Sequence, residues 1–120
     1  MAGNVTVLER KTFPPGARIF KEGDEGNRAY VVQQGMIEIA KLVNNEEVVL
    51  GTVTEGGIFG EMALIDDQPR MASARAIKGT TLIIITREMF MQKLAKSDPF
   101  IRGLLNIFTK HIRSLAKQAK

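Results

Sequence analysis

The 120-residue sequence contains no cysteine and only one histidine, His111. Without cysteine the chain can form neither a disulfide nor a thiolate metal site. A metal-dependent enzyme on a small barrel of the cupin type needs several histidines, so one histidine argues against that class. Ser73 and His111 also lack an acidic residue at the spacing of a hydrolase triad. We therefore expect no catalytic activity, no cofactor and no metal.

Long apolar runs are also absent. No stretch approaches the roughly 20 apolar residues that a membrane-spanning helix needs. The first four residues lack the basic region and apolar run of a signal peptide. The composition, with 44% hydrophobic and 25% charged residues, is that of an ordinary globular chain. We expect a cytoplasmic protein without a membrane span, folded as one domain over residues 1–120.

The net charge of +4 is unevenly distributed. From Arg87 onward the chain has eight basic and two acidic residues, whereas acidic residues prevail before it. The favoured explanation is a solvated helix face. The alternative is a surface for an acidic partner, a membrane or nucleic acid.

Residues from about 13 to 85 have the pattern of short strands separated by turns. Asn44 and Asn45, with Glu46 and Glu47, are typical of a hairpin tip. The strand segments are rich in β-branched residues or alternate apolar and polar ones, at 18–20, 29–32, 36–42, 48–50, 71–77 and 80–85. Strands followed by helices predict a mainly β protein: an antiparallel β-roll, jelly-roll-like, with flanking α-helices and a long C-terminal helix.

The pattern becomes helical over about residues 87–118. Thr86 is placed to cap a helix over 87–96, and Pro99 to begin the next one after Ser97 and Asp98. The second helix carries a heptad-like apolar stripe, widened by Leu104 and Ile107, at Ile101, Leu105, Phe108, Ile112, Leu115 and Ala119. We expect one broad face packed on the strands, since so short a stripe makes a weak coiled coil alone. The alternative places one flank on the domain and the stripe on a second copy.

The segment from Gly56 to Ala76 holds the chemistry of a ligand site. Glycines leave backbone N–H groups free, and one helical turn over 61–65 would attract an anion at its start. Arg70 can grip a phosphate through two oxygens. Glu61 would repel a phosphate unless it accepts a hydrogen bond from a hydroxyl of the same ligand, so the segment suits a sugar phosphate. In the alternative, Glu61 only complements the helix dipole and Arg70 only pairs with Asp66 or Asp67.

Two motifs in this segment, Phe59-Gly60-Glu61-Met62-Ala63-Leu64 and Pro69-Arg70-Met71-Ala72, have a recognisable order. Together they resemble the phosphate-binding cassette of the cyclic nucleotide-binding domain. That family includes catabolite activator-type regulators, protein kinase A regulatory subunits and cyclic nucleotide-gated channels. Upstream residues resemble the family too, namely Pro15-Gly16, Ile19-Phe20, the run from Glu22 to Gly26, Tyr30 and Gly35. We call residues 59–72 the cassette.

The resemblance implies a role for each part of the site. Glu61 would hold the ribose 2′-OH and Arg70 the cyclic phosphate. The N–H groups of Gly60, Ala63 and Met71 would complete the anion site, with Phe59, Met62 and Ala72 as its other cassette residues. Ile39 and Leu50 would lie against the base. The last helix would close over the base near residues 113–116.

The resemblance also implies a regulatory function. Met71 has no hydroxyl where some family members use one for the phosphate or for guanine, which favours cAMP over cGMP. Ligand binding would be transmitted through residues 86–96 to the long helix and an unidentified downstream partner. The alternatives are a sensor fragment of a larger transcription regulator, channel or kinase, or a scaffold that binds no nucleotide. The sequence leaves no room after Lys120 for a helix-turn-helix, so we expect no specific DNA binding. For the oligomeric state we expect a monomer or a helix-mediated homodimer.

Overall fold

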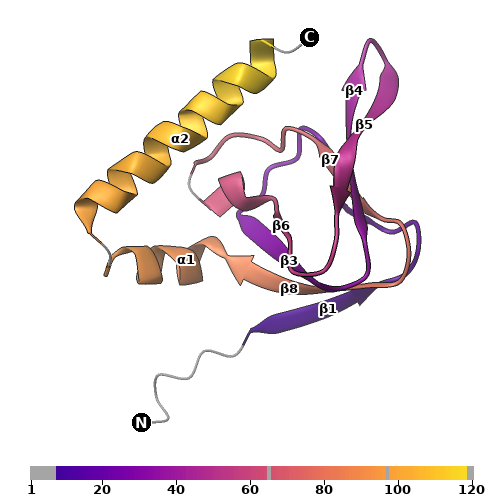
Figure 1. Ribbon diagram of the computed structural model, residues 1–120, viewed down its shortest axis with the longest axis horizontal. Coiled ribbons are helices and arrows are strands. Elements are labelled where there is room, and N and C mark those ends of the chain that lie inside the picture. The colour runs from indigo at the N-terminus through magenta and orange to yellow at the C-terminus, as the bar shows by residue number, and fades with distance from the viewer. Residues whose placement is uncertain (1–7, 65, 97, 119–120) are drawn as a thin grey trace.

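The computed structural model describes residues 8–64, 66–96 and 98–118. Within these ranges the strands form two antiparallel sheets, ordered β1-β8-β3-β6 and β2-β7-β4-β5 (Figure 1). The strands are β1 (Glu9–Phe13), β2 (Arg18–Phe20), β3 (Arg28–Gln34), β4 (Ile37–Val43), β5 (Glu46–Val53), β6 (Ile58–Phe59), β7 (Ser73–Ala76) and β8 (Thr80–Thr86). The predicted mainly β architecture, an antiparallel roll with helices, is confirmed.

The core lies where the two sheets face each other. Strand β8 illustrates the principle, because Thr80, Leu82 and Ile84 are buried while the residues between them are partly exposed. Such alternation turns every second side chain inward. Both sheets contribute to the buried cluster of Tyr30, Val32, Ile37, Phe59, Ala74, Ala76, Leu82 and Ile84. The cluster anchors β6, which leads directly into the cassette.

The β4–β5 hairpin confirms the predicted tip. Asn44 and Asn45 have φ values of 54° and 66°, and Val43 is paired with Glu46. Two positive φ angles in a two-residue loop match the twist of the flanking strands, and asparagine tolerates them. Glu46 and Glu47 belong to β5 rather than to the tip, which corrects the predicted boundary.

Two strands escaped the sequence prediction. Strand β1 precedes the predicted start of the roll near residue 13 and pairs along the whole of its length with β8. Its sequence, Glu-Arg-Lys-Thr-Phe, carries no apolar alternation because it is an exposed edge strand. Strand β6 has only two residues, too few to give any periodic signal.

The helical segment begins as predicted. The Thr86 hydroxyl accepts a hydrogen bond from the Met89 N–H at 3.1 Å and caps α1 (Arg87–Leu94). Helix α2 (Pro99–Gln118) begins at the expected proline, with an Asp98 carboxylate oxygen accepting from the Phe100 N–H at 2.8 Å. Helix α1 ends two residues before the predicted Lys96. Neither described helix is long and apolar enough to cross a membrane.

The expectation that α2 packs a broad apolar face on the strands is wrong. Helix α2 turns back from α1 past the cassette (Figure 1), yet Phe108, Ile112 and Leu115 are each more than half exposed, and Ile101 is 44% exposed. Leu105 is half-buried, and Ala119 lies outside the described residues, as do Ile65 and Ser97. The buried side chain of α2 is Thr109. The helix therefore turns its polar flank toward the domain and leaves the apolar stripe uncovered.

Candidate functional site

A cavity of about 280 Å³ opens beside the cassette, between β4, β5, β6 and α2. Its size is near the lower end for small-ligand sites. All ten residues predicted for the site line it: Ile39, Leu50, Phe59, Gly60, Glu61, Met62, Ala63, Arg70, Met71 and Ala72. The remaining lining residues are Phe20, Val53, Ile58 and Arg113. The fold thus gathers residues that are up to 93 positions apart, from Phe20 to Arg113, around one space.

The cassette starts with a tight reversal of the backbone. Gly60 follows β6 at a φ of +72°, a conformation that L side chains rarely adopt. A Cβ there would also lie 2.8 Å from Nη1 of Arg70. The chain then forms the 3-10 helix η2 (Glu61–Leu64), which confirms the predicted helical turn, and the Ala63 N–H donates to the Gly60 carbonyl at 3.3 Å.

Arg70 is the buried cation of the site, with 8% of its surface exposed. Its Nη2 donates to the Arg28 carbonyl at 2.9 Å and its Nη1 to the Gly60 carbonyl at 3.2 Å. The guanidinium carbon lies 4.0 Å from the centre of the Phe20 ring. Burial lowers the pKa of Arg70, and the neighbouring Arg113 lowers it further, while Tyr30 and Asp24 oppose the shift. An arginine ordinarily titrates so far above neutrality that this one remains charged at physiological pH.

The simpler explanation of Arg70, a surface pair with Asp66 or Asp67, does not hold in this structure. Asp66 binds Arg113, and Asp67 binds Arg87. Among the described residues, Nε of Arg70 is buried without a hydrogen-bond acceptor. A buried N–H without a partner is unusual in proteins and marks places where a further interaction is expected.

Glu61 is the first residue of η2 and is exposed at the mouth of the cavity. It lines the same cavity as Arg70, so one ligand can reach both a carboxylate and a guanidinium. The facing wall is apolar, with Ile39 from β4, Leu50 and Val53 from β5, and Ile58 from β6. Leu50 is 58% exposed, which leaves apolar surface for a flat ring to cover.

Two arginines from the helices hold the middle of the cassette. Arg113 of α2 donates to both carboxylate oxygens of Asp66, at 2.8 and 3.0 Å, and to the Pro69 carbonyl at 3.1 Å. Arg87, the first residue of α1, donates to the carbonyls of Ala63 and Asp66 and to the Asp67 carboxylate. Both helices are therefore bonded directly to the segment that lines the cavity.

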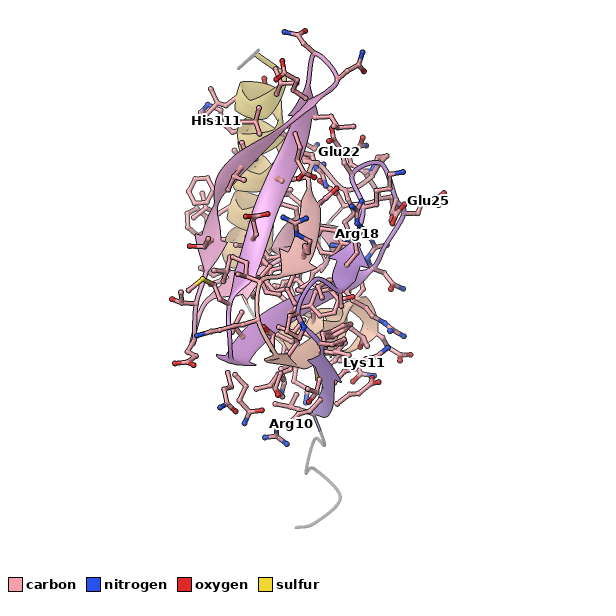
Figure 2. The ribbon with its side chains drawn as sticks, turned by 90° about the vertical axis from the view of Figure 1, so that its right-hand side faces the viewer. Arg10, Lys11, Arg18, Glu22, Glu25 and His111 are labelled. Carbon is pink, nitrogen blue, oxygen red and sulfur yellow. The ribbon has the colours of Figure 1, made fainter. Side chains whose placement is uncertain are left out.

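The far end of the cassette is held by Lys41 of β4, and Lys41 is paired with Glu22 of the loop between β2 and β3, which is labelled in Figure 2. Lys41 donates to the Met71 carbonyl at 3.0 Å and to Glu22 at 2.9 Å. Glu22 also accepts from the Leu42 N–H at 2.9 Å. Burial raises the pKa of Glu22, but the hydrogen bonds from Leu42 and Lys41 outweigh it, so the pKa lies below its ordinary value.

The sequence does not predict the lining residues Phe20, Val53 and Ile58, nor Arg87, as parts of the site. From the sequence, Phe20 is expected as a strand residue within the family resemblance, and Arg87 only as part of a basic helix. No local signal pairs either with the cassette, because β2 and α1 approach it only in the folded chain. Arg113 fell within the range 113–116 expected near the base, and the side chain of Ala116 is not described.

His111 projects from α2 (Figure 2) and is exposed. In the described part of the chain, no three histidine or acidic side chains are grouped as metal ligands would be. The charged residues that line the cavity are thus Arg70, Arg113, which is paired with Asp66, and Glu61, and the rest of its wall is largely apolar.

Comparison with known proteins identifies a family that resembles this chain. The sequence model of the family described as "Cyclic nucleotide-binding domain" matches residues 10–97. The "Cyclic AMP receptor protein" of Thermus thermophilus is 28% identical over 110 residues, which cover 91% of this chain and 51% of the relative. A "cAMP-dependent protein kinase regulatory subunit" of Pyricularia oryzae is 33% identical over 96 residues, which cover 80% of this chain and 24% of the relative. The chain thus spans about half, or less, of the length of these relatives.

Solved structures show the same similarity. The EAL enzyme Bd1971 in its cAMP-bound form superposes with a TM-score of 0.82 at 35% identity, over 88% of this chain and 28% of that one. Its cGMP-bound form gives the same TM-score at 34% identity, over 92% of this chain and 30% of that one. Similarity at this level shows that the fold is shared.

Proposed function

This chain belongs to the cyclic nucleotide-binding domain family, and we propose that its cavity binds cAMP in preference to cGMP and that the domain is regulatory rather than catalytic. One observation carries the proposal: Arg70, buried and charged, and Glu61, exposed at the mouth, line the same cavity. Residues 1–120 act as one unit in this proposal, with the β-roll over about 13–85 sensing the ligand and the helices over about 87–118 responding.

Each group has one role in the bound state. Arg70 binds the cyclic phosphate, and Glu61 accepts a hydrogen bond from the ribose 2′-OH. The N–H groups of Gly60 and Met71 face the phosphate. The Ala63 N–H donates to the Gly60 carbonyl in this structure, and in the bound state it donates to the phosphate as well. The base lies on the apolar wall formed by Ile39 and Leu50, where burying apolar surface contributes about 25 cal/mol per Å².

The choice of cAMP rests on Met71, which is one of the residues that line the cavity. It offers no hydroxyl to a guanine amino group. A ligand polar group that loses its water without a partner costs about 1–3 kcal/mol. We therefore expect isothermal titration calorimetry to give a dissociation constant for cAMP at least about fivefold below that for cGMP, with Met71→Thr narrowing the difference. Equal affinities of the unaltered protein for cAMP and cGMP would contradict the preference for cAMP. If the protein bound neither nucleotide, the result would favour the alternative of a scaffold that binds no nucleotide.

Ligand binding reaches the helices through the arginine contacts of the cassette. Arg87 and Arg113 bond to the backbone or side chains of residues 63–69, so a shift of the cassette moves their anchor points. A ligand changes the balance between two helix positions only by the difference in its affinity for them. The position in which Arg113 of α2 binds Asp66 is one of these two helix positions.

Asp66→Ala should loosen α2, and Asp66 is not itself one of the residues that line the cavity. A partly buried pair of this kind is worth about 1 kcal/mol, or about fivefold in the equilibrium between docked and released helix. Amides of α2 in the ligand-free protein should then exchange with deuterium several-fold faster than in the unaltered protein. Glu47→Ala, which removes the same charge from an exposed position on β5, is the control. Unchanged exchange in α2 would show that the ion pair does not hold the helix.

The exposed stripe on α2 supports a helix-mediated homodimer over the monomer. Phe108 and Ile112 lie on the same exposed flank, as the knobs of a two-helix seam do. We expect sedimentation equilibrium to show a dimer at micromolar concentration, and Phe108→Glu to shift it to monomer. Asn106→Glu, which places the same charge on an exposed polar position of α2, should leave the dimer intact. A monomer at all concentrations would contradict the homodimer. The apolar stripe of α2 would then be a surface for the downstream partner, as in a larger regulator, channel or kinase.

A further inference from the structure

The loop between β2 and β3 holds Arg70 by its backbone. The Arg70 N–H donates to the Asp24 carbonyl at 2.8 Å, and the Gly23 N–H donates to the Arg70 carbonyl at 2.9 Å. These reciprocal bonds fix the distance between the loop and the arginine. The loop cannot retreat from the Arg70 side chain without breaking them.

Gly26 lies in this loop directly against the guanidinium. A Cβ at Gly26 would stand 2.6 Å from Nη2, 2.8 Å from Nε and 3.0 Å from the central carbon of Arg70. These distances are shorter than van der Waals contact permits, so something must shift. The backbone of Gly26 has no positive φ, so alanine is compatible with its conformation.

A second contact also holds the guanidinium. Its face rests on the Phe20 ring, and that ring is packed against Tyr30 and Phe59 at centroid distances of 6.1 and 6.0 Å. With the ring and the loop both held, the flexible end of Arg70 is the part that must move when a methyl group is added at Gly26.

We propose that Gly26 is a positioning residue for Arg70: the missing side chain, beside Nε and Nη2, sets the place from which the guanidinium meets an anion in the cavity. The proposal rests on the proposed function, since it concerns the cation that would bind the cyclic phosphate. A methyl group at Gly26 displaces the guanidinium and lowers affinity while it leaves the β-roll intact. Gly26 itself does not line the cavity, so the effect acts only through Arg70.

The test is a double-mutant cycle read by calorimetry with cAMP. Gly26→Ala should weaken binding by at least about tenfold, and in an Arg70→Ala background it should cause no further loss. Gly79→Ala is the matched control, because a Cβ there meets nothing within 4 Å and the residue has no positive φ. An unchanged affinity in Gly26→Ala, or a loss that persists without Arg70, overturns the proposal.

A second measurement does not depend on the nucleotide. The side-chain Nε resonance of Arg70, assigned by its loss in Arg70→Lys, should shift in ligand-free Gly26→Ala and stay in place in Gly79→Ala. If the unaltered protein binds no cyclic nucleotide, the proposed function fails, and this spectrum alone decides the positioning role. If Gly26→Ala fails to fold in the presence of Arg70 but folds in the Arg70→Ala background, that rescue shows the clash with the guanidinium, and failure to fold in both backgrounds overturns the proposal. An Arg70 resonance that does not move in the folded variant overturns the proposal.

Discussion

Arg70→Ala should weaken cAMP binding by at least about thirtyfold. Arg70 is 8% exposed and lines a cavity with a largely apolar wall, so the attraction of its guanidinium for a phosphate is little screened by water. Removing one partner of a buried, hydrogen-bonded charge pair typically costs about 2–5 kcal/mol, and 2 kcal/mol is about thirtyfold in affinity. Titration calorimetry on the two proteins measures the difference directly.

Two further variants separate charge, geometry and folding in this result. Arg70→Lys keeps the positive charge but loses the fork that can bind two phosphate oxygens, so its affinity should lie between the other two. Arg75→Ala removes an arginine from β7, where it pairs with Glu38 outside the cavity, and should bind cAMP normally. The melting temperature of each variant must be measured, because Arg70 also bonds two backbone carbonyls. A folded Arg70→Ala protein with normal affinity would show that the site has been assigned wrongly.

The cassette could be predicted from the sequence because its chemistry is local. Gly60, Glu61 and Arg70 lie within ten positions of one another in the sequence, and their order is what resembles the family's phosphate-binding cassette. The hairpin tip at Asn44 and Asn45 and the Thr86 cap were predictable for the same reason. In each case a backbone requirement is met by the residues at that position or next to it.

The surroundings of Arg70 could not be predicted, because its neighbours come from distant segments. The Arg28 carbonyl and the Phe20 ring reach it from β3 and β2, and a carbonyl carries no sequence signal at all. The orientation of α2 was missed for a related reason. Periodicity identifies an apolar flank, but which flank faces the domain depends on the ion pair between Arg113 and Asp66.

Glu61→Ala should lower the affinity for cAMP by about ten- to a hundredfold and should leave the affinity for 2′-deoxy-cAMP nearly unchanged. A hydrogen bond from a hydroxyl to a charged acceptor contributes about 1.5–3 kcal/mol, which corresponds to that range. The deoxy analogue lacks the hydroxyl, so the unaltered protein should already bind it weakly, and the substitution has nothing further to remove.

The effect of Glu61→Ala on the affinity for 2′-deoxy-cAMP distinguishes three roles for Glu61. If the carboxylate only complements the dipole of η2, its removal lowers the affinity for both ligands equally by disturbing the cassette. If the carboxylate is near the phosphate without a hydroxyl between them, its removal relieves repulsion and raises the affinity for the deoxy analogue. Only a carboxylate that accepts from the 2′-OH gives a loss confined to cAMP. Equal losses for the two ligands would therefore refute the ribose contact while leaving the role of Arg70 untouched.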